Sequence, residues 1–228
     1  MNTERILLYS VIAIKLAFVG AVIFFFGEDR LIWADTQHYA SLGRSLVMGH
    51  GLSFPGEAGA YEPTTEFMPF YPALLGAASF VPHGFLFVSF LQAILAGFTA
   101  LYVYRIGFFF MPAGWAAGAA LLFSFEPLIA SVHILLMPET LYVFFATSFL
   151  YYFLAHLRNS NQRDLYSAAG MLVLAVYTKP VAMYLAVFAV LFLLPMREGL
   201  RKAAVFSSIL IVLLMPWMIR NHALAGTY

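Results

Sequence analysis

The chain has 228 residues, of which 63% are hydrophobic and only 10% are charged, and its mean hydropathy is +0.87. Soluble domains are about 45–50% apolar and about 25% charged, so this composition excludes a soluble globular protein and a disordered one. The net charge of +1 gives no general attraction to nucleic acid, and the absence of cysteine excludes disulfides, thiolate metal sites and thiol redox chemistry.

Seven apolar segments are predicted to cross a membrane as helices, because a spanning helix needs about 20 apolar residues. The first segment is predicted to be a span and not a cleaved signal peptide. It exceeds the apolar core of a signal peptide, and no small-x-small cleavage site follows it. The predicted spans are residues 6–26, 84–104, 113–131, 139–156, 165–178, 180–195 and 203–218.

The fifth and sixth spans form one apolar run that is interrupted at Thr178-Lys179-Pro180. Proline disfavours helical geometry at the residue before it, so a break is predicted at Lys179. Two crossings place the basic residues after this run on the inner side, as the positive-inside rule prefers, whereas one crossing places them outside. We therefore predict two short crossings, with Lys179 at the outer turn and the N-terminus inside. The basic residues predicted on the inner side are Arg5, Arg105, Arg158, Arg163, Arg197, Arg201 and Lys202.

Residues 27–83 form the one long predicted loop, on the outer side of the membrane, and long loops in compact proteins are usually functional. Asp35 or Thr36 can cap a helix that runs to about Met48 and lies in the membrane interface. Its apolar face, which Asp35 borders, would consist of Tyr39, Leu42 and Leu46.

The rest of this loop is predicted to be irregular over residues 55–63 and to form a second interfacial or re-entrant helix over 73–81. The chain is thus predicted to be one membrane module. Its parts would be a first span, an active-site loop over 27–83, spans two to seven over 84–218, and an outer tail over 219–228.

The order of several motifs resembles that of the membrane glycosyltransferases of the GT-C type. The likeness is greatest to the branch that contains protein O-mannosyltransferases and lipid A aminoarabinose transferases. The motifs are Asp35-x3-Tyr39-Ala40, Leu46-x2-Gly49-x-Gly51-Leu52-Ser53-Phe54, Met68-Pro-Phe-Tyr-Pro-x-Leu-Leu-Gly76, Pro138-Glu139, Thr178-Lys179-Pro180 and Pro216-Trp217-x2-Arg220-Asn221.

The chain departs from this family in two ways. Family members often carry Asp-Glu at the first motif, where this chain has Asp35-Thr36, so a second acid would have to come from elsewhere. The family also usually continues well beyond the last motif. The chain is therefore expected to be a fragment, or a member that lacks the acceptor-binding part.

The resemblance implies an all-α, GT-C-like bundle that transfers a sugar from a polyprenyl-phosphate donor to an acceptor hydroxyl. The acceptor would be a lipid, a glycan or a protein. The reaction would take place at the periplasmic face of a bacterial inner membrane, with the lipid tail of the donor in a groove between spans. Phosphate is a good leaving group, so one carboxylate base is sufficient. A base that acts from the face opposite the phosphate would invert the anomeric centre, whereas a hydrolase would need a carboxylate pair.

Asp35 is the predicted base, with a helix cap as the alternative role. The predicted ligands of the donor phosphate are Lys179, Arg220 and Arg44, because guanidinium and ammonium groups hold phosphate well; binding of lipid headgroups is their alternative role. The residues predicted to contact substrate are Tyr39, His38, Glu66, Tyr71 and Glu139.

Glu139 has a structural alternative, since an acid is favourable at a helix N-terminus. Glu126, inside an apolar span, is predicted to pair with a buried base such as Lys15. No histidine pair has metal-ligand spacing, so no metal site is predicted, while a role for a divalent cation stays open. No cofactor or nucleotide motif is present.

Two other functions fit the sequence less well. A transporter or flippase of lipid-linked sugars would show repeats and broken helices, and only the break at Lys179-Pro180 is of that kind. A non-catalytic assembly subunit would bind lipid or protein without transferring a sugar.

Overall fold

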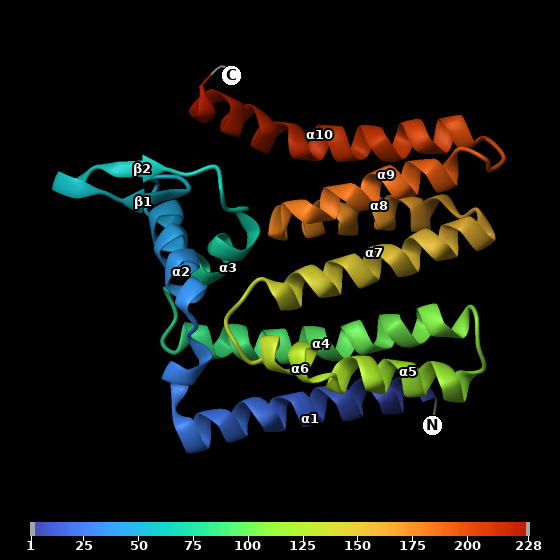
Figure 1. Ribbon diagram of the computed structural model, residues 1–228, viewed down its shortest axis with the longest axis horizontal. Coiled ribbons are helices and arrows are strands. Elements are labelled where there is room, and N and C mark those ends of the chain that lie inside the picture. The colour runs from blue at the N-terminus through green and yellow to red at the C-terminus, as the bar shows by residue number, and fades with distance from the viewer. Residues whose placement is uncertain (1–2, 227–228) are drawn as a thin grey trace.

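The structure is a computed structural model that describes residues 3–226 (Figure 1). Long helices lie side by side, and each runs opposite to its predecessor in the chain. Residues 27–83 gather at one end of this bundle, which we call the loop end, and the chain starts at the other end. The bundle helices are α1 (Thr3–Phe26), α4 (Gly84–Phe108), α5 (Ala113–Phe125), α7 (Glu139–Asn159), α8 (Gln162–Thr178), α9 (Met183–Leu193) and α10 (Gly199–Ala225).

Four helices of the described chain, α1, α4, α7 and α10, are long and apolar enough to cross a membrane. α5 and the segment Pro180–Leu193 are also apolar but shorter. The chain is therefore an all-α membrane protein, as the composition predicts. Helix lies over each of the seven predicted spans, and crossing by the shorter helices stays a prediction.

The predicted break before Pro180 is confirmed. α8 ends at Thr178, Lys179 is extended, and a short 3-10 helix (Pro180–Ala182) leads into α9. α10 continues through residues 219–225 of the predicted outer tail, and the position of this segment outside the membrane stays a prediction. Residues 227–228 of that tail lie outside the described residues.

The predicted span over 113–131 is interrupted at Glu126, where α5 gives way to the short helix α6 (Pro127–Val132). The Glu126 carboxylate does not pair with Lys15, so that prediction is wrong. It accepts a hydrogen bond from the Ile129 N–H at 2.8 Å and caps α6. Lys15 Nζ donates instead to the Ser124 carbonyl at 2.7 Å, because the last carbonyls of a helix lack partners within it.

Two helices of the loop lie across the end of the bundle, as Figure 1 shows. The first is α2 (Ala34–Val47), close to the predicted bounds, and the second is α3 (Phe70–Ala78), which begins three residues earlier than predicted. A 3-10 helix (Glu28–Leu31) precedes α2. The orientation of α2 agrees with the predicted interfacial helix.

The segment predicted to be irregular contains a small hairpin. Strands β1 (Ser53–Pro55) and β2 (Tyr61–Pro63) pair antiparallel, with Ser53 opposite Pro63 and Pro55 opposite Tyr61. The 3-10 helix Glu57–Gly59 forms its tip. Each strand ends in a proline, which a two-stranded sheet tolerates because both strands are edges.

Buried side chains of α3 connect the loop to the core. Tyr71 and Leu75 are fully buried and belong to the main apolar cluster, which also contains Leu141 of α7, Leu172 of α8 and Phe206 of α10. The loop thus shares one core with the bundle through α3, and α2 packs on α3.

α2 and α3 cross at two glycines. A Cβ atom on Gly43 would collide with the Pro72 carbonyl and the Gly76 backbone nitrogen. We expect Gly43→Ala to destabilise the protein by about 1–3 kcal/mol, because backbone atoms cannot move aside as a flexible side chain can. Thermal unfolding in detergent measures this.

Gly114→Ala is the matched control, because nothing lies within 4 Å of its added methyl group and alanine favours helix. Equal unfolding temperatures for the two variants would contradict the close packing of α2 on α3.

Candidate active site

Two charged side chains from different helices meet at the loop end. Glu139 opens α7 directly after Pro138, and Lys179 follows the last residue of α8 directly before Pro180. Lys179 Nζ lies 2.5 Å from Glu139 Oε1, and 31% and 27% of the two side chains are exposed. The second Glu139 carboxylate oxygen is buried without a hydrogen-bond partner in the described chain. The pair is thus half-sheltered from water but still open to a ligand.

Tyr39 of α2, one helical turn after Asp35, lies within electrostatic range of this pair. Tyr39 is half-buried, and its ring lies 5.3 Å from that of Tyr71. Burial, and then the negative charges of Glu139 and Asp35, raise the pKa of Tyr39 to about 12. Tyr39 therefore stays a neutral hydroxyl at physiological pH, within electrostatic range of both carboxylates.

Asp35 itself is exposed, and its carboxylate makes no hydrogen bond or ion pair within the described residues. The capping role belongs to Thr36, whose Oγ1 accepts from the Trp33 N–H at 2.9 Å and donates to the Leu136 carbonyl at 2.9 Å. The alternative of Asp35 as the helix cap is therefore wrong.

Tyr71 lies beneath Tyr39 and is fully buried. Its hydroxyl donates to Gln92 Oε1 at 2.9 Å, and Gln92 Nε2 donates to the Leu135 carbonyl at 2.8 Å. Burial, and then the charge of Glu139, raise the pKa of Tyr71 well above its usual range. Tyr71 thus packs against Tyr39 from the buried side, and Gln92 holds the Tyr71 hydroxyl in place. Gln92 was missed in the sequence analysis, although a single amide side chain within an apolar span could have indicated it.

Aromatic rings form one wall of the site. The His38 ring lies 5.9 Å from Phe54 and 6.4 Å from Phe67, and Phe67 lies 5.4 Å from Tyr39. Flat rings of this kind suit the apolar faces of sugars. Glu66 lies next to Phe67 in the loop with an exposed side chain, and its N–H donates to Thr64 Oγ1 at 3.2 Å.

Arg220 binds the loop itself. Its guanidinium donates to the carbonyls of Thr64 at 2.6 Å and Leu52 at 2.9 Å, and it lies 4.7 Å from the Trp217 ring. The Thr64 N–H donates to the Leu52 carbonyl at 3.0 Å, so Arg220 closes the base of the hairpin. These contacts occupy much of the guanidinium that was predicted to bind phosphate.

We expect Arg220→Gln to speed amide hydrogen exchange over residues 52–64 by at least about tenfold, because two charge-assisted hydrogen bonds to the loop are lost. Hydrogen exchange with mass spectrometry on the purified protein measures this. Arg201→Gln is the control, because Arg201 is exposed at the opposite end of the bundle. If Arg220→Gln left hydrogen exchange unchanged but abolished donor binding, Arg220 would have the predicted phosphate-binding role instead.

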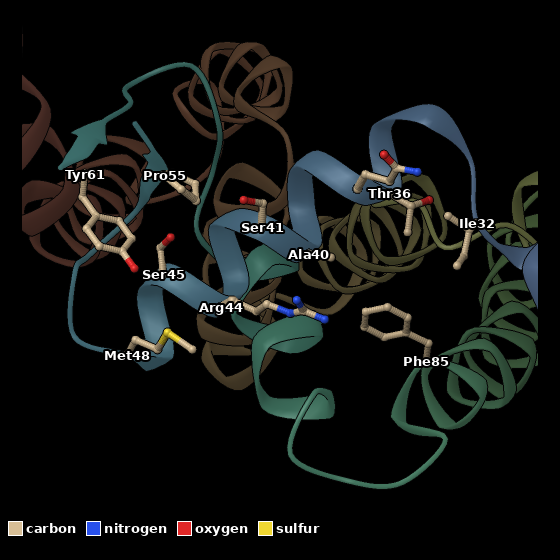
Figure 2. Close-up of a pocket in the computed structure, with 11 residues that line it drawn as sticks. Ile32, Thr36, Ala40, Ser41, Arg44, Ser45, Met48, Pro55, Tyr61 and Phe85 are labelled. Atoms are coloured by element: carbon tan, nitrogen blue, oxygen red, sulfur yellow. The ribbon is translucent and has the colours of Figure 1, made fainter. Parts of the chain in front are cut away.

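Arg44 lies apart from the other predicted phosphate ligands. It lines a hollow of about 450 Å³ on the other face of α2, which we call the α2 groove (Figure 2). Tyr39 thus lies within electrostatic range of Asp35 and of Glu139, and Glu139 pairs with Lys179, whereas Arg44 lines the separate α2 groove. Further lining residues are Gln37, Ser41, Ser45, Tyr61 and Phe85.

Within residues 3–226, no group of three or more His, Asp or Glu residues is placed to hold a metal ion. The question of a divalent cation therefore stays open.

Comparison with known proteins gives one family. The family model described as dolichyl-phosphate-mannose-protein mannosyltransferase matches residues 67–219, which include Tyr71, Glu139 and Lys179. No curated protein and no solved structure matches the chain. The family match confirms the resemblance expected from the motifs.

Proposed function

Because the chain belongs to the dolichyl-phosphate-mannose-protein mannosyltransferase family, and is thus a membrane glycosyltransferase of the GT-C type, we propose a specific reaction for it. It transfers a sugar from a polyprenyl-phosphate donor to an acceptor hydroxyl at the loop end. Asp35 is the base, and Lys179 binds the donor phosphate. The observation that supports this proposal is that Tyr39, one helical turn after Asp35, lies within electrostatic range of both Asp35 and Glu139, the partner of Lys179.

The chemistry needs few groups. As the acceptor oxygen bonds to the anomeric carbon, Asp35 takes the hydroxyl proton, and the bond between the sugar and the phosphate breaks. The electron pair of that bond goes to the phosphate, and the Lys179 ammonium stabilises the growing negative charge. Attack from the face opposite the phosphate inverts the anomeric centre. Glu139 positions Lys179, and Tyr39 offers a neutral hydroxyl for a hydrogen bond to the sugar.

An apolar groove supports the lipid-phosphate donor. It has a volume of about 260 Å³ and is lined only by apolar side chains of α7 and α9, among them Phe153, Leu185 and Phe188. Its lining residues on α7 begin ten positions after Glu139, so the groove lies about 15 Å along the bundle from the charged pair. A polyprenyl chain whose phosphate lies beside Lys179 would have to run along the bundle to reach this groove.

The proposed orientation puts the loop end outside, in the periplasm of a bacterial cell. The opposite end carries the basic residues predicted to be inside, and there Arg105 pairs with Glu4 at 2.9 Å. The positive-inside rule then directs this end to the cytoplasm. The donor would reach the site from the outer leaflet of the inner membrane.

The test is sugar transfer by the protein in liposomes, with a panel of labelled polyprenyl-phosphate sugars and with nucleotide sugars for comparison. We expect transfer, or slow hydrolysis of the donor, with one of the lipid-linked sugars alone. Donor binding without any turnover would favour the non-catalytic subunit, and movement of intact donor across the bilayer would favour the flippase.

A further inference from the structure

The α2 groove lies on the face of α2 that points away from Asp35. Nine helical steps of about 100° separate Asp35 from Arg44 and place them about half a turn apart. In Figure 2 the sticks of the groove lie on the near side of α2, and other helices of the bundle pass behind it. The groove is lined by α2, the hairpin and the start of α4, whereas the proposed donor site lies by α7 and α8.

Arg44 gives the groove its charge. Its side chain is exposed and extends along α2 toward Phe85 (Figure 2). No hydrogen bond or ion pair engages its guanidinium within the described part of the chain, and no carboxylate lines the groove. An uncompensated guanidinium in a hollow is suited to bidentate contact with a phosphate or carboxylate group.

The other lining side chains suit a carbohydrate. Gln37, Ser41 and Ser45 offer amide and hydroxyl groups on successive turns of α2. Tyr61 closes the hairpin end of the groove, and its ring stacks on His50 at 3.7 Å. Such stacking holds the Tyr61 ring in place, so its hydroxyl is available in a fixed position.

We propose that the α2 groove binds an anionic carbohydrate, namely the part of the acceptor that does not react. The inference rests on the proposed function, because a transferase needs an acceptor site distinct from its donor site. Thr36 lines the groove at the N-terminal end of α2 and is the neighbour of Asp35 in the chain. An extended acceptor in the groove would therefore pass around this end of α2, where the base lies.

The experiment measures binding of two labelled oligosaccharides of equal length, one phosphorylated and one neutral, to the full chain in nanodiscs of neutral lipid. We expect the phosphorylated probe to bind at least about tenfold more tightly, and Arg44→Gln to abolish the difference, since charge-assisted hydrogen bonds are the strong ones. Arg44→Lys should keep part of it. Arg30→Gln is the control, because Arg30 is an exposed arginine of the same loop that does not line the groove.

Three binding results would overturn the inference: equal binding of the two probes, equal loss in the Arg30 variant, or displacement of the phosphorylated probe by anionic phosphatidylglycerol in the nanodisc. The last result would assign Arg44 to a lipid headgroup. Binding is measured without turnover, so failure here is distinct from failure of the proposed transfer. Unchanged sugar transfer by Arg44→Gln would reject the groove as the acceptor site but would leave the proposed transfer reaction intact.

Discussion

Replacement of Asp35 by asparagine is expected to lower the rate of sugar transfer by about 10²- to 10⁴-fold, the usual contribution of a general base. Asparagine has nearly the same shape as aspartate but cannot take up the acceptor proton. The Asp35 carboxylate has no partner in the described chain that its loss would leave unsatisfied. The variant should therefore fold as the wild type does and bind the donor with unchanged affinity.

The measurement is single-turnover transfer in liposomes with the donor that the panel identifies, together with donor binding. Asp29→Asn is the matched control, since Asp29 is an exposed aspartate of the same loop that precedes α2. If Asp35→Asn transferred sugar as fast as the wild type, another group would have to be the base. The flippase and the subunit hypotheses both predict that Asp35→Asn changes nothing.

Replacement of Lys179 by glutamine is expected to weaken donor binding by about 10- to 100-fold, the usual effect of losing a hydrogen bond to a charged group. The ammonium is then absent from the place where the phosphate would bind. The change also leaves Glu139 without the partner that lies 2.5 Å away in the wild type. Loss of binding alone would therefore not separate a direct contact from local disorder.

The double variant Lys179→Gln, Glu139→Gln separates these two causes. It removes both charges of the pair, so no half-sheltered carboxylate is left unpaired, and thermal stability should recover toward that of the wild type. Donor binding should stay weak, because the cation is still missing. Recovery of donor binding in the double variant would show that Lys179 acts only by pairing with Glu139. Lys202→Gln, at the opposite end of the bundle, is the control for a general loss of positive charge.

Local patterns in the sequence determined the membrane helices and the helix α2 of the loop, but not its hairpin. Apolar length predicts α1, α4, α7 and α10, because each must match the thickness of the hydrocarbon layer. Proline at 180 predicts the break that exposes Lys179, since it constrains only the residue before it. The spacing of Tyr39 and Leu42 predicts the buried face of α2, because helical periodicity depends only on residues that are close together in the chain.

Local patterns also led to errors where a distant partner decides. Glu126 is an acid and Lys15 is a base, and each lies within an apolar segment, which suggests an ion pair between them. In the structure Lys15 donates a hydrogen bond to a carbonyl at the end of α5, and Glu126 accepts one from a backbone N–H at the start of α6. Helix termini leave backbone N–H and carbonyl groups without partners within the helix. The need for a side-chain partner can be recognised only once the position of the helix end is known.

Contacts between residues far apart in the chain were decided only by the tertiary structure. Lys179 meets Glu139 from 40 positions away, and Arg220 reaches Leu52 across 168 positions. The sequence placed both Arg220 and Arg44 among the phosphate ligands because guanidinium chemistry suits that role at any site. Whether a guanidinium reaches the phosphate depends on how α2, α3 and α10 pack against one another. Close backbone contact between α2 and α3 at Gly43 fixes the rotation of α2, and therefore the face on which Arg44 lies.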